Sequence, residues 1–157
     1  MPCCDGNGAG ADARGRVGLW TGLRVARRTQ GPAPVAAGLR IRLPGRDRIL
    51  SLAEVEVLDA EGTNVALGAL AVQSSTGFNG PPQLAVDGNT SGVYLDGSVT
   101  HTATEADPWW EVTFEAPSEI HGLRVWSRTG GDLEMRLEGC EVTLLDEAGE
   151  PTRRAAP

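Results

Sequence analysis

Six consecutive residues, Asp87-Gly88-Asn89-Thr90-Ser91-Gly92, concentrate oxygen-bearing side chains on a stretch with no helical pattern. Ca²⁺ binds roughly six to eight carboxylate, amide, hydroxyl and carbonyl oxygens in flexible geometry. The stretch begins like the calcium loop of a helix-loop-helix site, but Ser98 stands where that loop has a bidentate Glu, and no helical pattern flanks it. These residues fit either a calcium loop of another kind or a metal-free loop built on Asx turns.

Residue types that carry catalysis are sparse in this chain. Cys3 and Cys4 are adjacent, and Cys140 lies in an apolar strand pattern, so neither a disulfide framework nor a Cys-x-x-Cys metal site is predicted. No nucleophile elbow, phosphate-binding loop, zinc motif or defensible pair of carboxylates occurs. The sequence therefore predicts a protein that is not an enzyme, in which Cys140 is a small buried apolar residue.

The composition predicts one globular domain. The chain has 157 residues, of which 40% are hydrophobic and 22% charged, which is room for one ordinary core and not comfortably for two. No stretch approaches the roughly 20 apolar residues of a membrane-spanning helix, so no membrane span is expected. The first residues show no basic region followed by an apolar run, so no signal peptide is visible.

The charges divide the chain into two parts. All fourteen positive charges are Arg, and the formal net charge is -7. Residues 1–48 carry a net charge of +6 and residues 49–150 carry -15. The acidic body disfavours nucleic acid as a partner, and the Arg residues of the first part lack the interleaved aromatic residues of a nucleic-acid site. We therefore expect no nucleic-acid partner.

Short β-type runs separated by turn residues dominate the rest of the sequence. We expect strands within 39–43, 49–58, 64–74, 110–114, 120–127 and 140–145. Trp110, Val112 and Phe114 alternate with polar residues, which is typical of a strand that buries one face. The predicted fold class is all-β, an antiparallel β-sandwich. We expect residues 1–37 to be a disordered leader rich in Arg, Gly and Ala, residues 38–150 to be the domain, and residues 151–157 to be a tail.

The segment from Phe78 to Pro108 is long for a loop in a compact domain and is rich in Gly, Asn, Pro, Asp and Ser. Loops of this length are usually functional, disordered or held by something such as a metal ion. Because the oxygen-rich stretch lies inside it, we expect the loops and not the core to carry function.

Five ordered motifs over residues 38–150 resemble the F-type (fucolectin-like) lectins, within the galactose-binding-like or discoidin (coagulation factor type C) β-sandwiches. They are Ala85-Val86-Asp87-Gly88-Asn89-Thr90, Ser98-Val99-Thr100-His101-Thr102, Asp107-Pro108-Trp109-Trp110-Glu111-Val112, Ser127-Arg128-Thr129 and Arg136-Leu137. The resemblance implies a galactose-binding-like jelly roll and one Ca²⁺ that stabilises the loops near a sugar. It also implies glycans, fucose-like or galactose-like, as partners.

The resemblance implies calcium ligands in two separate parts of the chain. In the polar loop they are the carbonyl of Leu84 and the side chains of Asp87, Asn89 and Ser98. The family's remaining ligands lie in its closing strand, which here corresponds to the front segment Leu52-Ala53-Glu54-Val55-Glu56-Val57 and supplies the carbonyl of Ala53 and the carboxylate of Glu54. The chain therefore looks circularly permuted; the competing interpretation is the tail of one lectin domain followed by the head of another.

The resemblance also implies a sugar site made of His101, Arg128 and Arg136, because guanidinium and imidazole N–H groups can read the arrangement of sugar oxygens. The family's Arg-x-Asp places Gly130 where its Asp stands, and Asp132 is the nearby candidate. The vicinal Cys-Cys pair of some members is missing. Reduced affinity or altered specificity is therefore expected.

Two functions of different classes follow from these observations. The first is a non-enzymatic, calcium-stabilised carbohydrate-binding module. The second is a discoidin-type adhesion module that binds protein or lipid headgroups through apolar loop tips such as Phe78, Val93, Tyr94 and Leu95, or a degenerate structural accessory domain beside other domains of a larger bacterial protein. Sugar and calcium chemistry suggests an extracytoplasmic location.

Overall fold

The computed structural model describes residues 10–11, 17–18, 32–130 and 133–152. Its strands are β1 (Gly10–Ala11), β2 (Val17–Gly18), β3 (Val35–Arg42), β4 (Leu52–Leu58), β5 (Leu70–Gln73), β6 (Trp109–Glu119), β7 (Gly122–Ser127) and β8 (Glu141–Leu145). Three short 3₁₀ helices complete the described elements: η1 (Pro82–Val86), η2 (Tyr94–Asp96) and η3 (Leu133–Leu137). The predicted all-β class is confirmed, and no helix in the described residues is long and apolar enough to cross a membrane.

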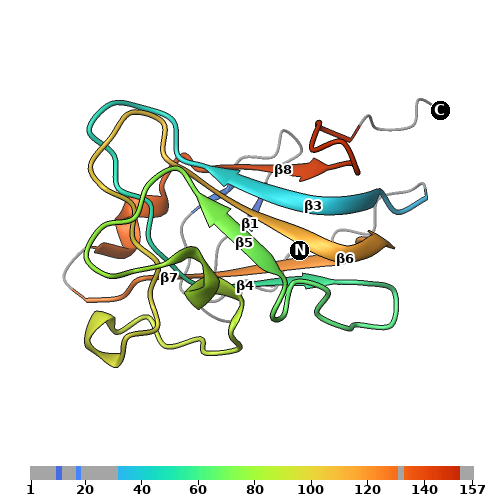
Figure 1. Cartoon of the computed structure of the whole chain (residues 1–157), viewed down its shortest axis with the longest axis horizontal. Coiled ribbons are helices and arrows are strands. Elements are labelled where there is room, and N and C mark those ends of the chain that lie inside the picture. Colours follow the sequence, from blue (N-terminus) through green and yellow to red (C-terminus); the bar gives the residue numbers. More distant parts are fainter. Residues whose placement is uncertain (1–9, 12–16, 19–31, 131–132, 153–157) are drawn as a thin grey trace, which may run out of the picture.

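Two antiparallel sheets form the layers of the sandwich (Figure 1). One sheet has the strand order β5-β6-β3-β8, and the other pairs β4 with β7. A separate two-residue pair, β1 with β2, lies within the segment expected to be a leader. The long connections of the sandwich gather at one end, on the left of Figure 1, where η3 lies beside the loop between β5 and β6. This end carries every described residue that the sequence nominated for the sugar site.

The core fills the space between the two sheets with alternate residues from each strand. Trp110 and Val112 of β6 are fully buried and pack with Val55 of β4 and Val125 of β7. Trp110 also donates its indole N–H to the carbonyl of Pro82, at 2.9 Å, which anchors η1. The alternation predicted for this strand is therefore confirmed. The hydrogen bond from Trp110 to Pro82 also ties the long loop between β5 and β6 to the core.

The front segment of the chain occupies the middle of the larger sheet. β3 pairs with β6 on one side and with β8 on the other, although β6 begins 67 residues after β3 ends at Arg42. The next strand, β4, pairs with β7 from Leu58↔Gly122 to Leu52↔Ser127. This pairing sets Glu54 opposite Trp126 and brings the front segment to the same end as Arg128. The front segment thus folds back onto the strand that precedes Arg128, which both interpretations of the chain order predict.

The observed strand bounds all differ from the expected ones, and two of the differences bear on the fold. The run expected over 64–74 forms a strand only at Leu70–Gln73, because Asn64 turns the chain by accepting hydrogen bonds from the amides of Val57 and Ala66. β3 begins at Val35, so the domain boundary expected at residue 38 falls inside this strand. Ala36 is buried there and belongs to the core.

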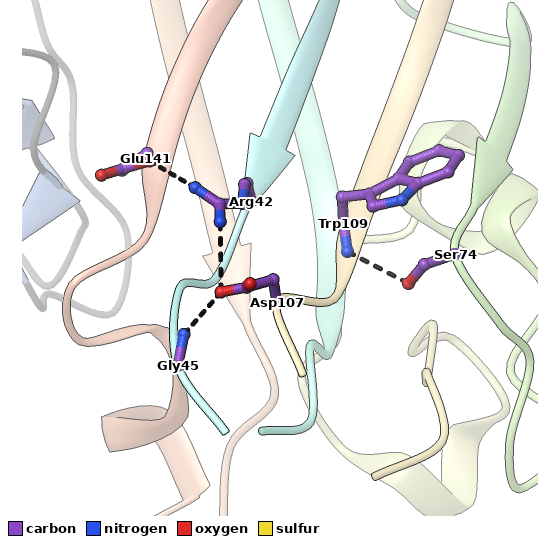
Figure 2. Close-up of polar contacts among 6 residues, drawn as sticks. All are labelled: Arg42, Gly45, Ser74, Asp107, Trp109 and Glu141. Carbon is purple, nitrogen blue, oxygen red and sulfur yellow. Dashed lines mark hydrogen bonds and ion pairs between the residues drawn. The ribbon is translucent and has the colours of Figure 1, made fainter. Parts of the chain in front are cut away.

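Figure 2 shows how the end of β3 is tied to the start of β6. The guanidinium of Arg42 lies 3.2 Å from Asp107 and 3.4 Å from Glu141. The amide of Gly45 donates to the same Asp107 oxygen at 2.8 Å. This amide, together with the charge of Arg42, lowers the pKa of Asp107. Asp107 has a φ of 53°, a left-handed conformation that these bonds hold in place.

Candidate functional site

Backbone hydrogen bonds join the loops that carry the candidate sugar residues. The amide of His101 donates to the carbonyl of Gly80 at 2.9 Å, which links the two arms of the long loop. The amide of Thr129 donates to the carbonyl of Gly92 at 2.8 Å, which ties the residue after Arg128 to the same loop. Residues far apart in the sequence are therefore held in one place by main-chain contacts.

Two glycines allow these close approaches. A Cβ on Gly80 would lie 2.5 Å from the amide nitrogen of His101, and a Cβ on Gly92 would lie 2.7 Å from the carbonyl oxygen of Ser127. The obstructing atoms are backbone, which cannot move aside without shifting the loop. Gly80 and Gly92 therefore set the positions of His101 and Arg128, a role that the sequence alone does not reveal.

His101 is buried, with 2% of its surface exposed, and its ring is held in one orientation. Nδ1 lies 2.7 Å from the carbonyl oxygen of Thr102, and because a carbonyl oxygen only accepts, Nδ1 carries the hydrogen. Burial lowers the pKa of His101, and the nearby charges of Arg128 and Arg136 lower it further. The neutral form of the ring is therefore favoured, with Nε2 as an acceptor, whereas the sequence predicted an imidazole N–H aimed at a sugar.

Arg128 directly follows β7 and lies against an aromatic wall. Its Cζ atom is 4.5 Å from the centroid of the Tyr94 ring, the distance of a cation–π contact. The same ring is 6.5 Å from His101, and Phe78 is 4.6 Å from His101 between ring centroids. The hydroxyl of Tyr94 donates to the carbonyl of Phe78 at 2.8 Å, which fixes the Tyr94 ring relative to Phe78. Tyr94 thus positions two of the three candidate sugar residues.

Arg136 completes the cluster from η3. Burial lowers the pKa of its guanidinium, and the charge of Arg128 lowers it further, so the two cations lie within electrostatic reach of each other. Nε of Arg128 and Nη1 of Arg136 are buried and have no hydrogen-bond partner among the described residues. Buried N–H groups without a partner are costly. The structure therefore brings His101, Arg128 and Arg136 into one cluster, in which two guanidinium nitrogens lack a hydrogen-bond partner among the described residues.

The acidic member of the predicted site cannot be located in the same way. Asp132 lies outside the described residues. Gly130, which stands where the family has its Asp, is exposed and has a φ of 99°. Among the side chains that the structure describes, which leave out residues 131, 132 and 134, no ion pair joins Arg128 or Arg136 to a carboxylate. The described residues of the candidate site therefore form a basic and aromatic cluster, called the pocket below.

Sequence reasoning missed the pocket role of the aromatic residues. Phe78 and Tyr94 were considered only as exposed tips for adhesion, whereas the structure puts their rings against His101 and Arg128. Their presence in an otherwise polar loop was the available signal, because the chain has only two Phe and one Tyr. Consecutive left-handed residues, Phe78 and Asn79 with φ of 50° and 55°, shape this loop tip.

Arg48 is a further residue that the sequence did not indicate. Its Nη2 atom donates to the carbonyl of Arg136 at 3.3 Å and to the carbonyl of Glu138 at 2.9 Å. Its own backbone pairs with Glu105 at the other side of the loop cluster. Arg48 is therefore a positioning residue that fixes the end of η3 from the front segment.

If this cluster binds a sugar, as the resemblance implies, replacing Arg48 with glutamine is expected to weaken that binding about three- to tenfold, because the charged donor to the carbonyls of Arg136 and Glu138 is lost. The lysine variant, which keeps a charged donor, is expected to recover part of the affinity. Titration calorimetry measures both variants, with Arg46→Gln as the control because Arg46 is an exposed neighbour. Equal affinity in Arg48→Gln and wild type would contradict this role.

The candidate calcium residues centre on Glu54, which is fully buried. Its Oε1 atom accepts a hydrogen bond from the amide of Gly88 at 3.2 Å, so the front segment does meet the polar loop. Its Oε2 atom is buried without a hydrogen-bond partner among the described residues. Burial raises the pKa of Glu54 to about 7, and the charges of Asp87 and Glu56 add to the rise. A buried carboxylate of this kind requires either a proton or a cation.

The loop facing Glu54 is built on Asx turns. Asp87 Oδ1 accepts from the amide of Asn89 at 2.8 Å, and Asn89 Oδ1 accepts from the amide of Ser91 at 3.1 Å. Ser98 is buried and donates its hydroxyl to the carbonyl of Ser91 at 2.6 Å. A chain of local contacts therefore runs from Asp87 to Ser98, as the metal-free interpretation of the residues also predicted.

The donor set fits Ca²⁺ in chemistry. The unpartnered Oε2 of Glu54, the nearby charge of Asp87 and the loop oxygens are hard oxygen ligands. Ala53 is buried beside Glu54 on β4, and Leu84 lies on η1, without a recorded contact between Leu84 and Glu54. No group of three or more His, Cys, Asp or Glu side chains suited to a metal occurs among the described residues. A calcium site here therefore depends on carbonyl, amide and hydroxyl oxygens as well.

Cys140 matches the structural expectation and not a catalytic one. It is buried in the core, and its amide donates to the carbonyl of Leu137 at 3.0 Å. Burial raises the pKa of its thiol to about 12, so the nucleophilic thiolate is not formed at pH 7. The other two cysteines, Cys3 and Cys4, lie outside the described residues.

Comparison with known proteins gives one family and two relatives. Residues 84–156 match the NedA-like, galactose-binding domain of the F5/F8 type C group. The pentraxin fusion protein of Xenopus laevis is 27% identical over 82 residues, which are 52% of this chain and 20% of that protein. The fucolectin of Anguilla anguilla is 30% identical over 86 residues, which are 52% of this chain and 54% of the fucolectin. The chain thus spans about a fifth of the length of one relative and about half of the length of the other. No solved structure gives a significant match.

Proposed function

Since residues 84–156 match the NedA-like, galactose-binding domain of the F5/F8 type C group, we propose that this chain is a non-enzymatic carbohydrate-binding module. The proposed sugar site is the pocket of His101, Arg128 and Arg136. The observation that carries this assignment is the convergence of these three residues, from separate loops, with buried guanidinium N–H groups that lack a partner among the described residues. A sugar supplies many acceptor oxygens in a small volume and can satisfy them.

The proposed recognition uses donors and an acceptor in fixed places. Arg128 and Arg136 donate to hydroxyl or ring oxygens of a fucose-like or galactose-like sugar. Nε2 of His101 accepts from a sugar hydroxyl, because Nδ1 is engaged with Thr102. The rings of Phe78 and Tyr94 form a wall against which the apolar face of a pyranose can pack. The arrangement selects a sugar by its hydroxyl geometry and supplies no pair of carboxylates for hydrolysis.

We assign Ca²⁺ a structural role in this module. The residues that would hold it are Glu54 and Asp87, with Asn89, Ser98 and the carbonyls of Ala53 and Leu84 as further oxygen donors. The ion would neutralise the buried carboxylate of Glu54 and stiffen the loop that leads to His101. It need not contact the sugar.

A discoidin-type adhesion module is the second candidate. Phe78 and Leu95 are exposed by 67% and 91%, and Val93 is also exposed, so the loops around the pocket present apolar side chains to solvent. Such tips can contact a protein or lipid headgroups. The observation that favours the sugar module over this one is that Phe78 also packs on His101 within the basic pocket.

A glycan array with competition by free sugar tests the proposed function. Capture on fucose- or galactose-bearing glycans that is abolished by the free monosaccharide supports the module. Capture by liposomes or by a protein surface that is insensitive to sugar would instead support adhesion. Binding of neither kind would overturn both assignments.

The affinity for a neutral sugar is expected to be constant near and above neutral pH and to fall only on acidification to the lowered pKa of His101. The pKa of His101 is lowered in the folded state, so its neutral form is favoured and the acceptor Nε2 persists down to that lowered pKa. Below it the ring gains a proton, loses its acceptor and adds a third positive charge beside Arg128 and Arg136. Calorimetric titration with fucose from pH 8 down to the lowest pH at which the domain stays folded measures the effect, which we expect to reach about tenfold once the ring is protonated.

The other histidine of the chain provides the matched control for this pH dependence. His121 is exposed and lies 3.6 Å from Glu119, away from the pocket residues. His121→Gln is therefore expected to leave the pH profile unchanged. An affinity for fucose that rises on acidification, or a fall that persists when His101 is replaced by Gln, would contradict the assignment of Nε2 as an acceptor.

A further inference from the structure

We infer that the sugar recognised by this pocket carries a negative charge, a carboxylate or a sulfate ester, that accepts hydrogen bonds from Arg128 and Arg136. The inference rests on the proposed carbohydrate-binding function and narrows its substrate class. It starts from how the arginines of the described residues are paired.

The sheet arginines with recorded ion pairs have carboxylate partners on the protein itself. Arg40 lies 2.6 Å from Glu111, and Arg124 lies 2.8 Å from Glu56. Arg42 bridges two carboxylates, as Figure 2 shows. Arg128 and Arg136 differ from these three, because neither has a carboxylate partner within the described residues and each has a buried nitrogen without an acceptor. The protein therefore neutralises these three sheet arginines, whereas Arg128, after β7, and Arg136, on η3, can pair with a ligand.

The two pocket cations also repel each other. The charge of Arg128 lowers the pKa of Arg136 in addition to the effect of burial, and His101 is held neutral and offers no compensation. A neutral sugar would satisfy the N–H groups but would leave two desolvated positive charges side by side. A carboxylate or sulfate satisfies the same groups with shorter, charge-assisted hydrogen bonds and cancels the repulsion.

The local charge contrasts with the rest of the domain. Residues 49–150 carry a net charge of -15, so a basic pocket is an exception on an acidic body and not part of a general basic surface. The negative charge of the surrounding surface repels a long polyanion more strongly than a small ligand with one charge, because only the small ligand contacts the basic pocket without the acidic surface. The aromatic wall of Phe78 and Tyr94 gives such a ligand an apolar face to contact, which an inorganic anion does not have.

Sugars that differ in the group at C6 test this inference. Galactose is compared with galacturonic acid, which carries a carboxylate at C6, and with galactose 6-sulfate. Fucose serves as a second neutral sugar, and inorganic sulfate serves as a simple anion. We expect at least one charged sugar to bind about tenfold more tightly than galactose at low salt, with the difference shrinking as the salt concentration rises. The two charged arms show whether the carboxylate or the sulfate is preferred.

Variants of the two arginines connect the preference to the pocket. Arg128→Gln and Arg136→Gln are each expected to reduce the preference for the charged sugar to about twofold or less, whereas Arg124→Gln is expected to keep it. Asp132→Asn tests whether this acidic residue already neutralises the arginines, in which case the variant and not the wild type would prefer the charged sugar.

Four results would overturn the inference. Galactose or fucose could bind as tightly as the charged sugars, which would refute the charge and retain the proposed function. Inorganic sulfate could bind as tightly as galactose 6-sulfate, which would indicate a simple anion site. A wild-type preference for neutral sugar that changes to a charged one in Asp132→Asn would assign the neutralising role to the protein. No binding of any sugar would overturn the proposed function itself.

Discussion

Replacing Arg128 with alanine is expected to abolish sugar binding while the melting temperature remains nearly unchanged. Nε of Arg128 makes no hydrogen bond within the described residues, so the fold loses little besides the cation–π contact with Tyr94. The substitution also removes the repulsion on Arg136. The bound sugar, by contrast, would lose charged donors at the centre of the site, which costs at least about a hundredfold in affinity. Titration calorimetry and thermal unfolding measure the two effects separately.

Arg124→Ala is the matched control, because Arg124 lies on β7 four residues before Arg128. It pairs with Glu56 at 2.8 Å, and both side chains are partly exposed. Its removal is expected to leave sugar binding intact and to lower the stability by less than about 1 kcal/mol. Arg128→Ala that still binds the sugar, or Arg124→Ala that loses binding to the same extent, would refute the assigned pocket.

The strands were predictable where the sequence alternates cleanly. Trp110, Val112 and Phe114 are buried while Thr113 is exposed, because residues of one parity face the opposite sheet. The run expected over 64–74 was longer than the strand β5, because a single side chain, Asn64, captures two amides and makes a turn. Local propensity does not show which of two competing hydrogen-bond arrangements a side chain will select.

The candidate site was only partly predictable for a related reason. His101, Arg128 and Arg136 were nominated by their motifs, and the structure brings them together. Tyr94 and Arg48 act through contacts with residues 34 and 90 positions away, and no pattern along the chain encodes such contacts. The tautomer of His101 also depends on a tertiary feature, because the carbonyl of Thr102 faces Nδ1 only in this loop conformation.

Replacing Glu54 with glutamine is expected to remove the response of the domain to calcium. If Ca²⁺ binds the carboxylate of Glu54, the wild-type melting temperature should rise by roughly 8–10 °C when the ion is present at about a hundred times its dissociation constant. Glutamine has nearly the same shape but carries no charge, and its amide is a weaker ligand for a hard cation. The melting temperatures of wild type and Glu54→Gln, each with calcium and with a chelator at pH 8, measure the effect.

The order of stability of wild type and Glu54→Gln should reverse between the chelator and the calcium condition. With the chelator at pH 8, wild type must bury an ionised carboxylate whose pKa burial has raised to about 7, so Glu54→Gln should be at least as stable as wild type. With calcium, wild type should be the more stable protein, because the ion compensates the charge. Glu56→Gln provides the control: Glu56 is two residues away on the same strand and has Arg124 as its partner, so this variant should keep the calcium response. A response that survives in Glu54→Gln would exclude Glu54 as a ligand, because the oxygen that lacks a partner in this structure would then have no part in holding the ion.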